Sequence, residues 1–208
     1  MGQTTRGIRS VLSIPLVYET FQRAVGSPRV RRHLVDTYVG DRPGIRVLDV
    51  GCGPGDLVTY LPAAVDYTGT DLSEAYIESA RRRFGSRGRF FAGRIEDLAA
   101  DELGEFDVVI AKSVLHHIDE DEILHLFKIA AGVLAPGGRL VTLDAAYTPD
   151  MSRAARFVVS RDRGQSILTP EGYRELAHRA FDSVDVKVHH DLLRIPYTHV
   201  FMSCSRPK

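Results

Sequence analysis

The residues best suited to binding chemistry form a glycine-rich turn, Gly51-Cys52-Gly53-Pro54-Gly55. A strand that runs into such a turn presents backbone N–H groups to a ligand, and glycine lets the ligand approach closely. The glycines alternate as G-x-G-x-G, and Asp56 stands where a dinucleotide fingerprint needs glycine or alanine. Asp56 also places negative charge where a pyrophosphate would lie, so the turn is less suited to a dinucleotide.

A carboxylate that follows this turn is the second feature with binding chemistry. Asp71 closes the segment Tyr67–Leu72, where a carboxylate can accept hydrogen bonds from both hydroxyls of a ribose. This arrangement favours an adenosine cofactor without a 2′-phosphate. The alternative is that Asp71 is a favourable charge at the start of the next helix, with Ser73 as the cap of that helix.

Alternating strands and helices must position these residues. The run Ile45–Val50 is short, rich in β-branched residues and closed by glycine, which predicts a buried strand. Asp119 and Glu122 have capping-box spacing at the start of a helix. The pattern predicts further strands at 67–70, 89–91, 107–110 and 138–144, with helices from Ser73, near 96–101 and over 120–134. Such alternation predicts a mostly parallel sheet.

The two ends of the chain depart from this alternation. Residues 1–40 are predicted to form a helical leader, in which Ser27 caps a helix and Pro28 starts it, and residues 41–208 form the main domain. Thr169 and Pro170 start a late helix, which strands 184–188 and 199–204 follow. Only residues 189–198 join these last strands, too few for a parallel crossover, so the last strand is predicted to be antiparallel.

Three segments in order resemble the motifs of class I S-adenosylmethionine-dependent methyltransferases. Val47–Gly55 is similar to their first motif, Phe106–Ile118 to their fourth-strand motif, and Leu134–Leu140 to the turn before their fifth strand. The resemblance covers residues 45–143. It implies an α/β, Rossmann-like fold with a seven-stranded, mostly parallel sheet, an antiparallel last strand and helices on both faces.

The resemblance also implies where the cofactor S-adenosyl-L-methionine, and its product S-adenosyl-L-homocysteine, would be held. Asp71 would bind the ribose, and Leu72 would pack on the adenine. The methionine part would lie against Asp49, Gly51, Cys52, Gly53 and Gly55, and the sulfonium end against Ala111, Lys112 and Ser113.

One position departs from the family pattern. Arg94 stands where relatives usually have an aspartate that accepts a hydrogen bond from the adenine amino group. Asp97 or the backbone at Ile95 can take over that contact. Arg94 can instead face an anionic substrate.

Acid–base candidates follow from the chemistry of methyl transfer. Transfer from a sulfonium is an in-line displacement, so alignment supplies most of the acceleration, and a general base helps only a protonated nucleophile. The candidates are His117, His116 and Tyr147, and two adjacent histidines are not expected to point into one cavity. The alternative for either histidine is a helix-start or core position. No metal site is expected, because Cys52 and Cys204 lack ligand spacing.

The acceptor is expected at residues 145–168, a substrate-side insertion over the carboxyl ends of the strands. Its arginines predict a carboxylate or phosphate on the acceptor, because guanidinium groups bind such anions bidentately. The alternative is a solvated amphipathic helix. The predicted substrate-binding residues are Tyr18, Gln22, Arg161, Arg163, Tyr197 and His199.

Composition limits the classes of partner. The net charge is zero, which disfavours nucleic acid, and the arginine clusters at 29–33 and 81–87 are interpreted as solvated helix faces. Two distant cysteines and the lack of a signal peptide or membrane span predict a cytoplasmic protein, a monomer or homodimer. The sequence predicts methyl transfer to an O or N atom of a small, anionic metabolite. The alternatives are an RNA or protein methyltransferase, a non-catalytic cofactor-binding protein and an NAD-dependent oxidoreductase.

Overall fold

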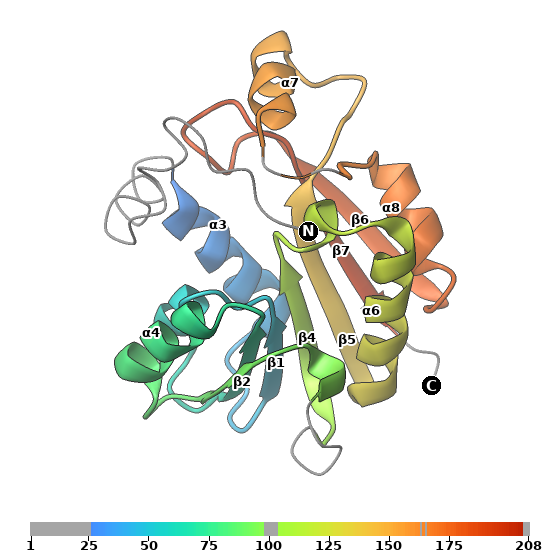
Figure 1. Ribbon diagram of the computed structural model, residues 1–208. Helices are drawn as coiled ribbons and strands as arrows, with labels where there is room; N and C mark the ends of the chain where they lie inside the picture. Colours follow the sequence, from blue (N-terminus) through green and yellow to red (C-terminus); the bar gives the residue numbers. More distant parts are fainter. Residues whose placement is uncertain (1–25, 98–103, 163, 165, 206–208) are drawn as a thin grey trace.

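A seven-stranded sheet forms the centre of the protein in the computed structural model, which describes residues 26–97, 104–162, 164 and 166–205 (Figure 1). The spatial order of the strands is β3-β2-β1-β4-β5-β7-β6. β7 is antiparallel to both of its neighbours and the other pairs are parallel, as the sequence predicts. The strands are β1 Arg46–Val50, β2 Asp66–Asp71, β3 Arg89–Ala92, β4 Phe106–Lys112, β5 Leu134–Ala145, β6 Ser183–His189 and β7 His199–Ser205.

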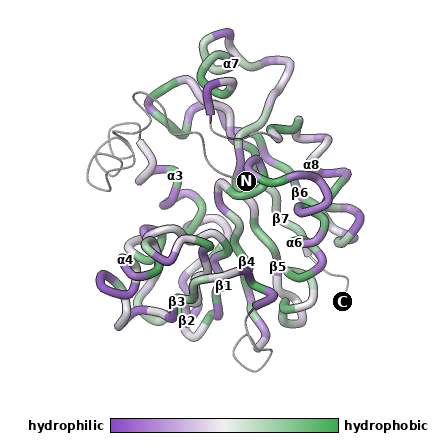
Figure 2. The backbone as a smooth tube through the Cα atoms, in the orientation of Figure 1, coloured by the Kyte–Doolittle hydropathy of each residue, from purple (hydrophilic) through white to green (hydrophobic). Residues whose placement is uncertain are grey.

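Helices cover both faces of this sheet, which confirms the predicted fold class. Figure 2 shows apolar segments along the central strands and hydrophilic segments on the helices around them. The α-helices are α3 Ser27–Leu34, α4 Glu74–Phe84, α6 Glu120–Val133, α7 Arg153–Ser160 and α8 Pro170–Ala177, with a π-helical turn at Val35–Val39 after α3 and 3-10 turns at Asp56–Thr59, Ile95–Asp97 and Leu115–His117. No helix in the described ranges is long and apolar enough to cross a membrane.

The core divides into two main clusters because successive strand residues point to opposite faces. In β1, Val47 packs with α3 and α4, whereas Leu48 packs with α6 and α8. In β7, Phe201 and Met202 divide in the same way. The sheet is therefore buried on both faces. In open α/β sheets of this kind, ligands bind at the carboxyl ends of the parallel strands.

Helix starts follow the predicted caps in most places. Asp119 and Glu122 form the predicted capping box of α6, with reciprocal side-chain to backbone hydrogen bonds. The Ser73 hydroxyl caps α4 and the Thr169 hydroxyl caps α8. The predicted cap of α3 is wrong by one residue, because Gly26 in a left-handed conformation precedes the helix and Ser27 already belongs to it.

Other elements also differ from the prediction. β5 begins at Leu134 rather than residue 138, because Leu134 pairs with Phe106 across an irregularity in the register. The short helix expected near 96–101 is a 3-10 turn at Ile95–Asp97 within the described residues. The insertion 145–168 contains α7, which buries Ala155 and Val159 and stands beyond the end of β5 (Figure 1).

Candidate functional site

The glycine-rich turn continues β1 and is fastened to β2. The N–H groups of Gly51 and Cys52 both donate to the carbonyl of Thr70, at 2.8 and 2.9 Å. Gly51, Gly53 and Gly55 all have φ between 57° and 79°, a region that L side chains rarely adopt. A Cβ on Gly51 would lie 2.6 Å from Val114, whereas one on Gly53 would meet nothing within 4 Å. The turn is thus fixed on its inner side and open at Gly53.

Asp71 connects this turn to the start of α4. One carboxylate oxygen accepts from the N–H of Gly53 at 2.9 Å, and the other accepts from the N–H of Ser73 at 2.8 Å. Each oxygen retains a lone pair, because a carboxylate offers about four acceptor positions. Asp71 therefore has the helix-start contact that the sequence offered as an alternative, and it still has acceptor capacity for a ribose.

A buried carboxylate lies beneath the turn. Asp49 is fully buried, and the Tyr67 hydroxyl donates to its Oδ2 at 2.7 Å. Its Oδ1 has no hydrogen-bond partner among the described residues. Burial raises the pKa of Asp49 to about 6, although the Tyr67 hydrogen bond and the charge of Lys112 act in the opposite direction. No local pattern identifies Tyr67 as the partner of Asp49, because the pairing depends on adjacent strands.

Arg31 lies closer to the turn than the sequence predicts. The interpretation of the 29–33 cluster as a solvated face is wrong for Arg31, whose exposed fraction is 9%. Its Nη2 lies 3.5 Å from Asp56, a carboxylate that also pairs with Arg83 at 2.9 Å. Burial and the charge of Arg31 lower the pKa of Lys112. Two cationic side chains, Arg31 and Lys112, therefore lie near the carboxyl end of β1.

The residues predicted around the adenine lie beyond β2 and β3. Leu72 is 72% exposed and Ile95 is buried. Asp97 accepts from the N–H of Arg94 at 2.8 Å. The Arg94 guanidinium pairs with Glu96 at 3.7 Å and with Glu122 at 3.6 Å. Arg94 thus has carboxylate partners of its own.

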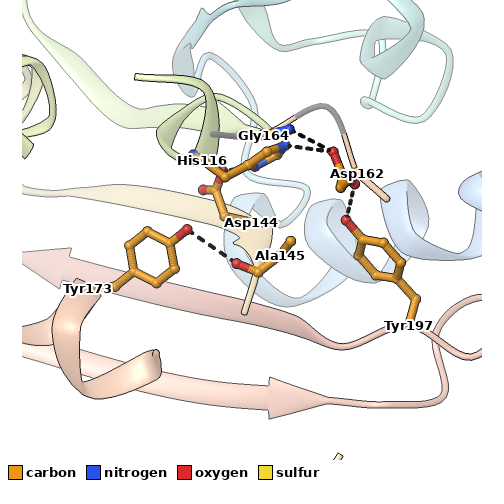
Figure 3. Close-up of polar contacts among 7 residues, drawn as sticks. All are labelled: His116, Asp144, Ala145, Asp162, Gly164, Tyr173 and Tyr197. Carbon is orange, nitrogen blue, oxygen red and sulfur yellow. Dashed lines mark hydrogen bonds and ion pairs between the residues drawn. The ribbon is translucent and has the colours of Figure 1, made fainter. Parts of the chain in front are cut away.

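A histidine held by two aspartates lies at the same sheet edge, in the 3-10 turn after β4 (Figure 3). His116 is 3% exposed, and its Nδ1 lies 2.8 Å from Oδ1 of Asp144 at the end of β5. Its Nε2 lies 3.5 Å from Oδ1 of Asp162, which follows α7. Burial alone would lower the pKa of His116, but the two carboxylates outweigh burial and raise it to about 9.

The His116 cluster consists of His116, Asp144, Asp162 and Tyr197. Its outer residues come from distant segments of the chain. Figure 3 shows Asp162 between His116 and Tyr197, whose hydroxyl donates to Asp162. Gly164 packs against His116 so closely that a Cβ would lie 2.4 Å from the imidazole. The three residues thus come from three different loops: His116 from the turn after β4, Asp162 from the segment after α7, and Tyr197 from the loop between β6 and β7. Asp144 is not among the predicted site residues, although its place at the end of the predicted strand 138–144 was a usable signal.

The rings of the two adjacent histidines lie close together. The His117 ring is exposed, yet its centroid lies 4.1 Å from that of His116. His116, His117 and Asp162 each offer a ligand atom, and these atoms lie within 4.8 Å of one another. The 3-10 turn thus brings the two rings into contact, with His116 buried and His117 exposed.

The remaining predicted acceptor residues lie in different surroundings. Tyr147 is half-buried, with the Arg156 guanidinium 5.6 Å from its ring centroid. His199 is buried beside Tyr197, and burial lowers its pKa to about 3. Arg161 is exposed and stacks on Phe157 at 4.8 Å. The predicted residues Tyr18, Gln22 and Arg163 lie outside the described residues.

Comparisons with known proteins agree with this architecture. Residues 47–138 match the family model described as a methyltransferase domain. The chain is 32% identical over 113 residues to a ubiquinone biosynthesis O-methyltransferase of Bordetella avium, covering 52% of this chain and 46% of that protein. It is 32% identical over 120 residues to a ribosomal RNA small subunit methyltransferase C of Chromohalobacter salexigens, covering 56% and 36%. The chain therefore spans less than half the length of these relatives.

A solved structure has a similar fold. The magnesium protoporphyrin IX methyltransferase of Synechocystis PCC 6803, with bound S-adenosylhomocysteine, superposes with a TM-score of 0.66 at 20% identity. The match covers 100% of this chain and 90% of that one.

Proposed function

We propose that this chain transfers a methyl group from S-adenosylmethionine to an O or N atom of a small, anionic metabolite, and the match of residues 47–138 to a methyltransferase-domain model supports the reaction class. The observation that carries this proposal is the position of the His116 cluster. The cluster lies at the carboxyl ends of β4 and β5, next along the sheet from the turn that follows β1. Donor and acceptor sites at neighbouring strand ends suit a transfer reaction.

The described residues fit the cofactor. Oδ1 of Asp49 has no hydrogen-bond partner among the described residues and can accept a hydrogen bond. A Cβ on Gly53 would meet nothing within 4 Å, so there is space beside the turn at that residue. In this proposal the turn from Gly51 to Gly55, with Cys52, and Asp49 hold the methionine part. Asp71 accepts from the ribose, Leu72, Ile95 and Asp97 flank the adenine, and backbone at Ala111, Lys112 and Ser113 lines the reacting end. When bound, S-adenosylmethionine supplies an electrophilic methyl group.

The chain's own residues then align and activate the acceptor. Ser113, with φ 58°, turns the chain away from β4, so that the 3-10 turn carrying His116 faces the sheet edge. We assign to His116, with His117 and Tyr147, the task of holding the acceptor and lowering its proton affinity. Tyr197 and His199 border this position. Alignment of the acceptor supplies most of the acceleration, and its deprotonation matters for a hydroxyl acceptor.

The charge proposed for the acceptor rests on the segment above the site. Arg161 presents an exposed guanidinium on the connection that also carries Asp162. The guanidinium lies over the Phe157 ring, and its N–H donors can bind a carboxylate or phosphate. A zero net charge disfavours RNA, although one relative is named for ribosomal RNA. The proposal includes a cytoplasmic location and a monomer or homodimer.

Labelled methyl transfer tests this function. The full chain is incubated with methyl-labelled S-adenosylmethionine and separate pools of small carboxylated metabolites, ribosomal RNA and protein. Label is expected in the small-molecule pool, and labelled RNA or protein would overturn the proposed substrate class. Stabilisation by S-adenosylhomocysteine without label in any pool would favour a non-catalytic binding protein, and stabilisation by NAD alone would favour an oxidoreductase.

A further inference from the structure

We propose that His116, His117 and Asp162 bind a divalent transition-metal ion, of which Zn²⁺ is the representative, beside the proposed acceptor position. Two imidazoles and one carboxylate are ligands that Zn²⁺ and related ions accept in proteins. The three ligand atoms lie within 4.8 Å of one another. The inference rests on the proposed function only for its consequence for the acceptor. The site itself can be tested separately.

The separation of His116 and Asp162 suits two ligands of one ion. Nε2 and Oδ1 are 3.5 Å apart. Two ligands of a tetrahedral ion with ordinary Zn–N and Zn–O bonds lie about 3.3 to 3.4 Å apart. A direct N–H···O hydrogen bond would bring the same atoms to about 2.7 to 3.2 Å. The distance between Nε2 and Oδ1 is therefore closer to that between two ligands of one ion than to that of a hydrogen bond.

The contacts of His116 prepare Nε2 as a ligand. Its Nδ1 lies 2.8 Å from Asp144, so a ring that has given up its Nε2 proton to make room for an ion keeps the Nδ1 proton and donates it to that carboxylate. Nε2 then presents a lone pair toward Asp162, and a positive centre between them removes the repulsion. A carboxylate behind a ligating histidine is a common arrangement, because it fixes the ring and raises its basicity.

The other ligands are also oriented by the fold. Tyr197 donates to Oδ2 of Asp162, which leaves Oδ1 directed toward His116, where it also accepts from the N–H of Gly164 at 3.3 Å. The His117 ring lies beside that of His116. Three protein ligands leave a tetrahedral ion one position for an oxygen of the acceptor, and such coordination lowers the pKa of a bound hydroxyl. With the ion in place, both histidines act as ligands and the acceptor's proton leaves to water.

Metal binding to the full chain tests the site directly. After treatment with a chelator, Zn²⁺ binding is measured by isothermal titration calorimetry, and Co²⁺ binding by the visible absorption that nitrogen and oxygen ligands give in a tetrahedral field. One ion per chain is expected. Asp162→Asn and His117→Gln should each raise the Kd for Zn²⁺ at least about tenfold, with circular dichroism showing that both variants fold.

A matched control comes from a second aspartate–histidine pair. Asp150 lies 3.4 Å from His190 and outside the cluster, so Asp150→Asn should leave the Kd unchanged. No binding to the wild type, or equal effects of Asp150→Asn and Asp162→Asn, would overturn the inference and leave a proton between His116 and Asp162. Methyl transfer by the wild type that persists in chelator would refute only the role of the metal in activating the acceptor. Failure of the wild type to bind S-adenosylhomocysteine would refute the proposed function.

Discussion

Oδ1 of Asp144 accepts from both the ring and the backbone of His116. The distance to Nδ1 is 2.8 Å and that to the backbone N–H is 3.3 Å. Asp144 is buried at the end of β5, and His116 belongs to the turn after β4, so one carboxylate fixes the segment and the ring that it carries. The orientation of His116 is therefore a property of two neighbouring strands.

Removing the carboxylate of Asp144 should lower the stability of the protein. Asp144→Ala leaves two buried N–H groups without their acceptor, and we expect a loss of about 1–3 kcal/mol in the free energy of unfolding, measured by urea denaturation. Asp144→Asn keeps an amide oxygen in the same place and should lose less stability. Equal stability of the alanine variant and the wild type would contradict the assigned contact.

Asp71 should govern cofactor affinity. Asp71→Ala is expected to raise the Kd for S-adenosylhomocysteine at least tenfold, about 1.4 kcal/mol, because the ribose loses its acceptor and the Gly53 N–H loses its partner. Isothermal titration calorimetry measures the change. Asp66→Ala is the matched control, since Asp66 begins the same strand at its opposite end. An affinity like that of the wild type would mean that the ribose lies elsewhere.

Asp49 should make stability depend on pH. Its pKa is raised from 3.8 to about 6 in the fold, so the folded state holds a proton that the unfolded state releases between these values. The contribution to stability is present below pH 4 and is lost as pH rises through about 6. Asp49→Asn avoids this loss, and its stability relative to the wild type should therefore increase by about 3 kcal/mol between pH 4 and pH 7.

Urea denaturation of both proteins across this pH range, without cofactor, measures the difference. Asp66→Asn provides the control, because Asp66 is exposed. A difference between Asp49→Asn and the wild type that is constant with pH would show that Asp49 does not titrate in this range.

Arg161 should affect the acceptor more than the cofactor. If it binds an anionic group, Arg161→Ala raises the acceptor KM several-fold and leaves the Kd for S-adenosylhomocysteine nearly unchanged. Steady-state kinetics with the acceptor found by labelling provide the measurement. Arg82→Ala is the comparison, because Arg82 is an exposed arginine on α4 whose partner is Glu78. Equally small effects of both substitutions would indicate that Arg161 belongs to a solvated face.

Local patterns were sufficient for most of the fold. Asp119 with Glu122, Ser73 and Thr169 mark helix starts through hydrogen bonds within a few residues, and the structure confirms these caps. The short connection 189–198 correctly indicated the antiparallel last strand. The boundary at Leu134 failed because its pairing with Phe106 is a contact between strands.

The residues around the site required the tertiary structure. Arg31 belongs to a cluster of basic residues whose composition is typical of a solvated face. It is buried only because α3 packs against the sheet. The pairing of Tyr67 with Asp49 needs two adjacent strands in one register. The contact between the rings of His116 and His117 likewise depends on the 3-10 turn that carries them.

The sequence by itself determined the glycine-rich turn, the carboxylate that ends β2 and the order of strands and helices. These features depend on backbone conformation and on periodicity along the chain, which neighbouring residues control. The tertiary structure alone decided that His116, Asp144, Asp162 and Tyr197 meet at one edge of the sheet. Their meeting depends on strand order and on the return of α7 over that edge, and no local interaction encodes it.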